Sequence, residues 1–562
     1  MTLRRLTRRE LFESSARGLG TALVLPLLLE ACAPASPSAS SAAPTAAAGK
    51  FSYPTFVPFK GPTPDLPGTT QGIADAYFSY PKNLVKTVAT PPGSGDAITL
   101  FTNPAGGMPL PVEQNPAWQQ VNKDLNVDFR LDLAGTAQDA AAKLSTIIAG
   151  GDLPDMLFLG PVSGGSIANL PDFLEAKCAD LTPFLAGDAV KTYPNLANYP
   201  GFAWRAPGVA YNNKIFGVPV VRAIAGNVLQ VRQDVVGSAG APSIKSADDF
   251  ARALKAVTRP NDNVWGIADQ NFTLTPLLAA QIFGAPNNWG LDSSGKLVKD
   301  YETEPFKAGL GFLRDLWSAG VFHPNTPTYT NVSAGNDFRA GRFGYYYFLE
   351  DALQITWAQL LQTTPDAQLS IVDPFSADGK AAPIYFLGTG NFGGSVLKKA
   401  SPDRIKEILG VLNYFGAPFG SQESLLLTYG LKDTDFSVDA GGNPVPLPNG
   451  FASHPVPWAF MTHGPVAVYS AVRPKDYANL VHGAETASIP VGVQDATLGL
   501  YSATNGKQGP ILKQMVNDGI AGIISGRQAL SDWDGLVRDW VSKGGDQIRQ
   551  EFQQALAARG TS

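Results

Sequence analysis

The 562-residue chain is poor in charge: Lys, Arg, Asp and Glu make up 16% of it, where about a quarter is usual. Its formal net charge is −5, so no basic excess is available to neutralise a nucleic acid backbone. It contains two cysteines, Cys32 and Cys178, which are too few for a disulfide framework. Charge and cysteine content therefore argue against a nucleic-acid-binding protein and against a disulfide-stabilised scaffold.

Sequence signatures of metal sites and hydrolases are missing as well. The segment Asp433–Asn443 spaces its carboxylates like a calcium loop, but Val438 and Pro444 stand where that loop needs Gly and Glu. No G-x-S-x-G nucleophile elbow and no P-loop occurs. The histidines include no pair at i, i+4 and no HExxH motif; they are His323, His454, His463 and His482. We therefore expect no metal, no cofactor and no catalytic residue.

Glycine is plentiful, and one glycine-rich stretch needs a separate interpretation. Residues Gly388 to Gly394 satisfy G-x-G-x-x-G, the pattern of dinucleotide-binding loops. Such a loop needs a helix at its third glycine, whereas the sequence that follows, GSVLKK, predicts a strand. The pattern therefore favours hinge or cleft backbone over a nucleotide site.

Residues 1–32 are typical of an export signal, so we do not count them as part of the folded body. Thr7 to Phe12 reads TRRELF, a twin-arginine pattern, and an apolar stretch follows that is shorter than the roughly 20 residues of a membrane span. The sequence Leu-Glu-Ala-Cys then resembles a lipobox, which predicts lipidation of Cys32. Glu30 departs from the small or apolar residue usual there. An uncleaved anchor with an incidental cysteine is the alternative.

Residues 33–96 are interpreted as a tether and an extended segment. Residues 33–50 are almost entirely Ala, Ser and Pro, and they offer too little apolar bulk to fold. Residues 51–96 stay rich in proline but carry aromatic side chains, so we expect them to lie on the folded body. A signal, a tether and a large body suit a receptor that works at a membrane surface.

The body begins with alternating strands and helices. Ala97 to Asn103 predicts a buried strand, and Asn115 to Leu125 predicts a helix with apolar residues at helical spacing. Asn126 to Leu133 then alternates like a strand, a second helix follows, and Met156 to Leu159 is a short apolar strand. This order predicts an α/β protein with a largely parallel sheet.

Six segments between Lys143 and Leu556 resemble bacterial extracellular solute-binding proteins, in the branch of large lipoproteins that serve carbohydrate ABC transporters. Lys143–Asp155 has the pattern K-L-x-x-x-I-A-G-G-D-L-P-D, and Lys214–Arg222 contains G-V-P. In the last segment Gly544 and Gly545 separate two amphipathic helices, and Asp546 is placed to begin the second. The remaining segments are Asn227–Leu254, Asp337–Phe348, Phe392–Phe415 and the rest of Ile523–Leu556.

The resemblance implies the two-lobed, type 2 periplasmic-binding fold, with a ligand cleft between lobes. We assign residues 97–221 plus 388–455 to one lobe and residues 222–387 plus 456–562 to the other. The implied function is capture of a sugar or oligosaccharide and its delivery to ABC permease subunits. The implied protein is a monomer, has no nucleic acid partner and is held by its lipid outside the cytoplasm, at a cell surface or in a periplasm.

Sugar sites stack aromatic rings on sugar faces and aim planar polar groups at hydroxyls. Arg222 follows the strand at which the family's chain enters the cleft, and Asn103 and Trp118 flank the first strand–helix turn, a usual ligand position in α/β sheets. Trp317, on a regular helical stripe, is assigned to the core, as are Trp533 and Trp540. The further candidates lie in or beside irregular segments: Trp204, Trp289, Tyr346, Tyr347, Glu350, Trp357 and Trp458.

Two other functions stay open at this point. A secreted carbohydrate-active enzyme would use the same cleft and would need two carboxyl groups converging on the sugar. A surface adhesion or sensory protein would have a vestigial cleft without convergent aromatic rings. The aromatic content favours an oligosaccharide over a monosaccharide, and peptides or other nutrients remain alternatives.

Overall fold

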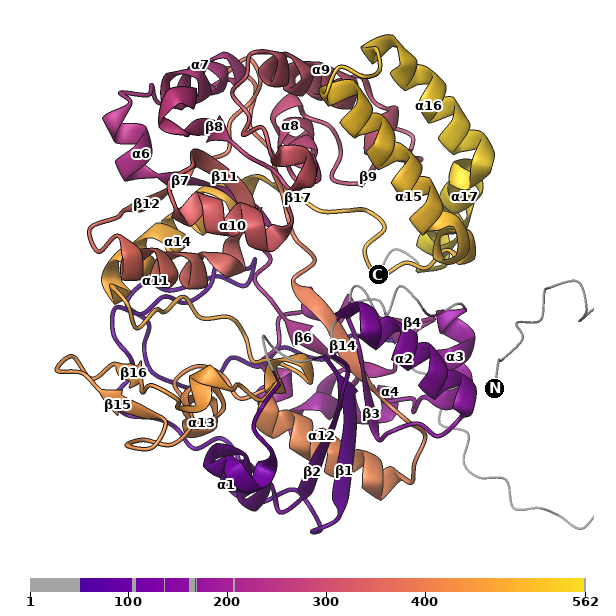
Figure 1. Ribbon diagram of the computed structural model, residues 1–562. Helices are drawn as coiled ribbons and strands as arrows, with labels where there is room; N and C mark the ends of the chain where they lie inside the picture. The colour runs from indigo at the N-terminus through magenta and orange to yellow at the C-terminus, as the bar shows by residue number, and fades with distance from the viewer. Residues whose placement is uncertain are drawn as a thin grey trace, which may run out of the picture. The chain divides into compact units, whose positions relative to one another are not determined.

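Two separate β-sheets organise the computed structural model (Figure 1). The structure describes residues 51–103, 108–135, 137–160, 167, 169–205 and 208–559. The predicted signal peptide, Cys32 and the tether up to residue 50 therefore lie outside the described residues. Among the residues that are described, no helix is both long enough and apolar enough to cross a membrane.

The first sheet has five strands in the order β2-β1-β3-β14-β6. β1 runs parallel to β2 and β3, whereas β14 runs antiparallel to β3 and β6. We call this sheet and the helices packed on it lobe 1. Its strands are β1 (Ala97–Thr102), β2 (Asp128–Leu133), β3 (Met156–Leu159), β6 (Gly217–Val221) and β14 (Asn391–Leu397). Its helices are α1 (Pro116–Leu125), α2 (Ala137–Gly150), α3 (Leu170–Lys177), α4 (Thr182–Leu185), α5 (Pro194–Ala197), α12 (Pro402–Phe415) and α13 (Gln422–Tyr429).

Local sequence explains where α1 begins and ends. The Asn115 side chain accepts a hydrogen bond from the backbone N–H of Trp118 at 3.0 Å, which caps the helix. Asn126 stops it in the left-handed region, with a φ of 51°. Val121 and Leu125 are fully buried against the sheet. The strand–helix–strand order predicted for this part of the chain is therefore observed.

The second sheet has four strands in the order β12-β7-β11-β8, with β7 antiparallel to both neighbours and β11 parallel to β8. We call it and its helices lobe 2. Its strands are β7 (Asn227–Arg232), β8 (Trp265–Ile267), β11 (Phe343–Leu349) and β12 (Leu369–Val372). Its helices are α6 (Gln233–Ser238), α7 (Ala247–Val257), α8 (Thr275–Phe283), α9 (Glu304–Ser318), α10 (Asn331–Arg339), α11 (Leu353–Thr363), α14 (Pro474–Ser488), α15 (Ala503–Ile524), α16 (Trp533–Trp540) and α17 (Asp546–Arg559).

The three C-terminal helices, drawn in yellow in Figure 1, pack on lobe 2. Gly544, with a φ of 138°, separates the last two helices, α16 and α17, and α17 begins at Asp546 as predicted. Trp533 and Trp540 are 1% and 2% exposed, so their assignment to the core is confirmed. Short two-stranded sheets complete the structure: β4 (Ala210–Tyr211) with β5 (Lys214–Ile215), β9 (Trp289–Leu291) with β10 (Leu297–Lys299), β13 (Tyr385–Phe386) with β17 (Gly492–Val493), and β15 (Phe436–Val438) with β16 (Pro444–Pro446).

From β1 onward, the described part of the chain crosses between the lobes three times. The first crossing is residues 222–226, between β6 and β7, and the second is residues 387–390, between β13 and β14. The third lies between the 3-10 turn Trp458–Phe460 and α14. The prediction that lobe 2 resumes at residue 456 is wrong for this turn, because Trp458 packs in the lobe 1 core with its ring centroid 5.4 Å from that of Phe415.

Residues 51–96 form an extended strap that touches both lobes. In lobe 1 the N–H of Val57 donates to the carbonyl of Ala197 at 2.7 Å, and the N–H of Gly93 donates to that of Leu125 at 2.9 Å. Between these anchors, the N–H of Ala74 donates to the Glu485 carboxylate on α14 of lobe 2, at 2.8 Å. The strap therefore runs from lobe 1 to lobe 2 and back.

Candidate ligand-binding site

The first two crossings are joined by backbone hydrogen bonds. The N–H of Arg222 donates to the carbonyl of Gly390 at 3.1 Å, and the N–H of Gly388 donates to that of Ile224 at 2.7 Å. At Gly226 a Cβ atom would lie 2.7 Å from the carbonyl oxygen of Phe386, so a side chain there would push the crossings apart. This pairing holds the end of β6 and the start of β14 together, where the two lobes meet.

Three phenylalanine rings form a cluster on lobe 1 at this place. The ring centroids are 5.3 Å apart for Phe158 and Phe460, 5.9 Å for Phe460 and Phe392, and 6.3 Å for Phe158 and Phe392. Phe158 is 1% exposed, whereas Phe392 is 37% exposed. The Arg222 guanidinium lies 5.6 Å from the centre of the Phe392 ring. The ring of Phe392 therefore offers an accessible aromatic surface beside a cationic group.

The side chain of Arg222 also faces lobe 2. Its Nε atom lies 4.0 Å from Oδ2 of Asp351, and the two side chains are 26% and 33% exposed. Asp351 belongs to the turn that follows β11. Burial lowers the pKa of Arg222 against the opposing effect of Asp351, and burial raises the pKa of Asp351 against the opposing effect of Arg222. Both groups keep open surface for hydrogen bonds to a ligand.

His463, in the third crossing, lies beside this pair. Burial, followed by the nearby charge of Arg222, lowers its pKa to about 4. One ring nitrogen, Nδ1, is 2.7 Å from the carbonyl oxygen of Gly464. The imidazole is therefore neutral at pH 7 and adds no second positive charge to the site.

Two buried carboxyl groups stand behind Asp351. Glu350 and Glu485 are 3% and 1% exposed, and burial raises the pKa of each; that of Glu485 reaches about 7. One Glu485 oxygen accepts from the backbone N–H of Ala74, and the other has no hydrogen-bond partner among the described residues. Glu350, a predicted ligand contact, is thus buried, and its neighbour Asp351 is the carboxyl group that reaches solvent.

The predicted tryptophans of lobe 1 lie in its core. Trp118, Trp204 and Trp458 are 7%, 1% and 4% exposed. Trp118 and Trp458 contact each other edge to face at 6.0 Å, and Trp204 packs on Tyr199 at 5.9 Å. Burial leaves these indoles no surface to offer a ligand, so we remove them from the proposed site.

The aromatic candidates of lobe 2 are buried as well. Trp289 packs between Trp540 and Phe552, and Trp357 packs on Tyr477. The two tyrosines of β11, Tyr346 and Tyr347, are each 2% exposed and fill the two faces of the sheet. They too are removed from the site, because core packing occupies their rings. Asn103 follows β1 and is partly exposed, and it stays a prediction.

Of the residues predicted for the site, Arg222 lies at the boundary between the lobes and stays a prediction, and the structure adds Phe392, Phe460 and Asp351, which were not predicted, as candidates. Phe392 carried a usable signal, because a large apolar side chain inside a glycine-rich stretch has few neighbours to bury it. Asp351 directly follows the candidate Glu350, and only the backbone of the turn decides which of the two points outward. Phe460 carried no signal of this kind.

The loop that resembled a calcium site uses its carboxylates for backbone hydrogen bonds. Asp435 accepts from the N–H groups of Leu431 at 2.8 Å and Phe451 at 2.9 Å, and Asp439 accepts from that of Asn443 at 2.8 Å. Within the described ranges no three His, Cys, Asp or Glu side chains are grouped to hold a metal ion. The glycine-rich stretch 388–394 leads into strand β14, as its sequence predicts.

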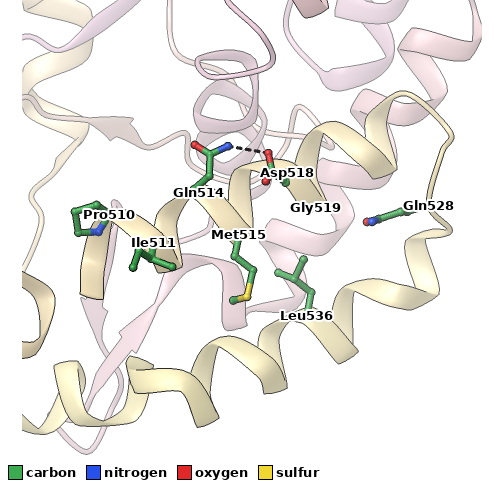
Figure 2. Close-up of a pocket in the computed structure, with 8 residues that line it drawn as sticks. All are labelled: Pro510, Ile511, Gln514, Met515, Asp518, Gly519, Gln528 and Leu536. Carbon is green, nitrogen blue, oxygen red and sulfur yellow. Dashed lines mark hydrogen bonds between the residues drawn. The ribbon is translucent and has the colours of Figure 1, made fainter. Parts of the chain in front are cut away.

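A separate groove lies between α15 and α16 (Figure 2). Its walls are mainly aliphatic, with a polar edge where the Gln514 amide donates to Asp518 at 2.8 Å. It is lined by Pro510, Ile511, Gln514, Met515, Asp518, Gly519, Gln528 and Leu536. No aromatic ring is among them, so this groove lacks the stacking surface that the Phe392 site offers.

Comparisons with known proteins address the fold. No protein-family model matches the chain. The polygalacturonan/rhamnogalacturonan-binding protein YtcQ of Bacillus subtilis is 22% identical over 430 residues, which cover 74% of this chain and 82% of that protein.

Two solved structures match most of the chain. An HMO-binding, ABC-transporter-associated solute-binding protein of Bifidobacterium longum infantis aligns with a TM-score of 0.61 and 12% identity, covering 84% of this chain and 100% of that one. The N-glycan transport solute-binding protein NgtS of Streptococcus pneumoniae aligns with a TM-score of 0.60 and 15% identity, covering 83% and 100%. The predicted resemblance and the two-lobed α/β fold class are confirmed: the chain has the fold of the solute-binding proteins that serve ABC transporters.

Proposed function

We propose that the chain is the substrate-binding protein of an ABC importer, which captures a sugar or oligosaccharide between its lobes and delivers it to the permease subunits. The observation that carries the proposal is the exposed ring of Phe392 beside Arg222 of lobe 1, whose side chain also faces Asp351 of lobe 2. The names of YtcQ, of NgtS and of the Bifidobacterium protein, all tied to carbohydrates or glycans, support this ligand class.

The geometry suits a sugar because it combines a flat apolar face with planar hydrogen-bonding groups. A sugar ring stacks on Phe392, the guanidinium of Arg222 donates to hydroxyl oxygens, and the carboxylate of Asp351 accepts from hydroxyl hydrogens. A ligand that contacts Phe392 and Asp351 together bridges the two lobes. Such a ligand stabilises the closed arrangement by its added contacts with the second lobe.

The proposal extends to the location of the protein. Export through the twin-arginine signal and lipidation at Cys32 hold the body outside the cytoplasm, and residues 33–50 give it reach from the membrane. The receptor acts as a monomer that meets its permease when closed around ligand.

A thermal-shift screen of the full chain against mono- and oligosaccharides, with peptides as controls, tests the proposal. A ligand at 100 times its dissociation constant adds about 2.7 kcal/mol to the free energy of unfolding, which raises the melting temperature measurably. A glycan that raises it and is recovered intact supports the receptor. A glycan recovered cleaved supports the enzyme instead, and a response to peptides alone overturns the ligand class.

A further inference from the structure

We infer that the ligand of this site carries no net charge, so that among glycans the protein selects neutral oligosaccharides over uronic-acid-containing ones. The inference rests on the proposed function and narrows its substrate class. It follows from how the charged side chains are arranged around Phe392, from both lobes.

The guanidinium of Arg222 already has a partner. Arg222 lies 4.0 Å from Asp351, and among the ion pairs that the structure describes this one joins the two lobes. A uronate carboxylate that approached Arg222 would have to displace Asp351 or lie beside it. Two carboxylates that share one cation repel each other, so either arrangement costs binding free energy.

Among the described residues placed here beside Arg222 and Asp351, none carries a positive charge that offsets this cost. His463, the neighbouring titratable base, is neutral at pH 7, and the buried carboxyl groups of Glu350 and Glu485 stand behind Asp351. The charges of Arg222 and Asp351 cancel, and any charge that Glu350 and Glu485 carry is negative. The net charge of these groups is therefore zero or negative, which disfavours an anionic ligand.

A neutral sugar uses the same groups without conflict. Each hydroxyl both donates and accepts, so one sugar can bind the N–H groups of Arg222 and the oxygens of Asp351 together. The ion pair stays intact, and the ring of Phe392 supplies the apolar contact. The cation of an amino sugar would compete with Arg222 for the carboxylate of Asp351 and repel the guanidinium.

An array of matched glycans tests this inference on the full chain. Each pair has one length and linkage, with a neutral member and a uronate member, for example methyl-esterified and free tetragalacturonate; amino-sugar oligomers form a third set. We expect the bound glycans to be neutral, with affinities about tenfold or more above those of their uronate partners. Tighter binding of uronate or amino-sugar members overturns the inference and leaves the proposed function standing. An array without any bound glycan contradicts the proposed function, and the inference with it.

The variant Asp351→Asn identifies the residue responsible. It removes the competing carboxylate at nearly constant shape, so the ratio of the affinities for the neutral and the uronate glycan of a pair should shrink by about tenfold. Asp403→Asn is the matched control, because that side chain is 94% exposed on α12. Asp403→Asn should leave the affinity ratio unchanged. If Asp351→Asn also leaves this ratio unchanged while its melting temperature stays the same, the role given to Asp351 is contradicted.

Discussion

The guanidinium of Arg222 and the carboxylate of Asp351 face each other across the boundary between the lobes, 4.0 Å apart. One group is on the crossing that leaves lobe 1, and the other is on the turn after β11 in lobe 2. Any movement of one lobe against the other changes this distance. The pair is therefore placed both to contact a ligand and to respond to lobe closure.

Replacing Arg222 by Ala should lower ligand affinity about tenfold or more and leave the melting temperature nearly unchanged. The side chain is partly exposed, and a partly exposed ion pair contributes little to stability. Calorimetric titration with a ligand found by the thermal-shift screen measures the first effect, and differential scanning calorimetry measures the second. Arg130→Ala is the control, since Arg130 pairs with Asp128 at the surface of lobe 1. A large drop in melting temperature would show that Arg222 is a structural residue.

The exposed and the buried ring of the phenylalanine cluster should respond in opposite ways to replacement by Ala. Phe392→Ala removes an exposed ring and should weaken ligand binding about tenfold with little loss of stability. Phe158→Ala removes a buried ring and should lower the free energy of unfolding by about 3–5 kcal/mol. Titration calorimetry and denaturant unfolding separate the two effects. Equal binding by Phe392→Ala and the unaltered chain would remove the ring from the site.

The fold was largely predictable from the sequence, and the site was predictable only in part. Capping and periodicity located α1, and the glycine pair at Gly544 located the break before α17, because these signals act within a few residues. The cluster joins Phe158, Phe392 and Phe460, which are separated by 234 and 68 residues, so no local pattern could reveal it. Irregular sequence around Trp204 suggested a cleft, but its place in the lobe 1 core, which gathers buried residues from Ile98 to Met461, decides its burial.

The burial of Glu485 should make stability depend on pH. Its pKa is raised from 4.5 to about 7, so the folded state keeps a proton that the unfolded state has already lost. The free energy of unfolding should therefore fall as pH rises from about 4.5 to 7, by up to about 3 kcal/mol, and then level off. Glu485→Gln should remove much of this slope in denaturant unfolding series; Glu350 contributes a slope of the same sign.

Glu551 provides the opposite case for comparison. Burial alone would raise the pKa of Glu551, but hydrogen bonds from Ser502 and Thr504 lower this pKa to about 2. The contribution of Glu551 to the free energy of unfolding is present above the pKa of the unfolded state and is lost as pH falls toward 2. Glu551→Gln should therefore destabilise the protein at pH 7 and not at pH 2. If both variants shifted stability alike at every pH, neither carboxyl group would titrate as described.

The strap should influence ligand binding through Gly72. This residue has a φ of 119°, and a Cβ atom there would lie 2.3 Å from Ile224 in the first crossing, two residues from Arg222. Gly95, also in the strap, has a φ of 99° and open space around its Cβ position. Ala at either position is strained by about 1–2 kcal/mol, but only Gly72→Ala also pushes on a crossing. We therefore expect similar backbone strain in both variants and a changed ligand affinity in Gly72→Ala alone. Titration calorimetry on the two variants checks this, and equal affinities would show that the strap is a passive cover over the hinge.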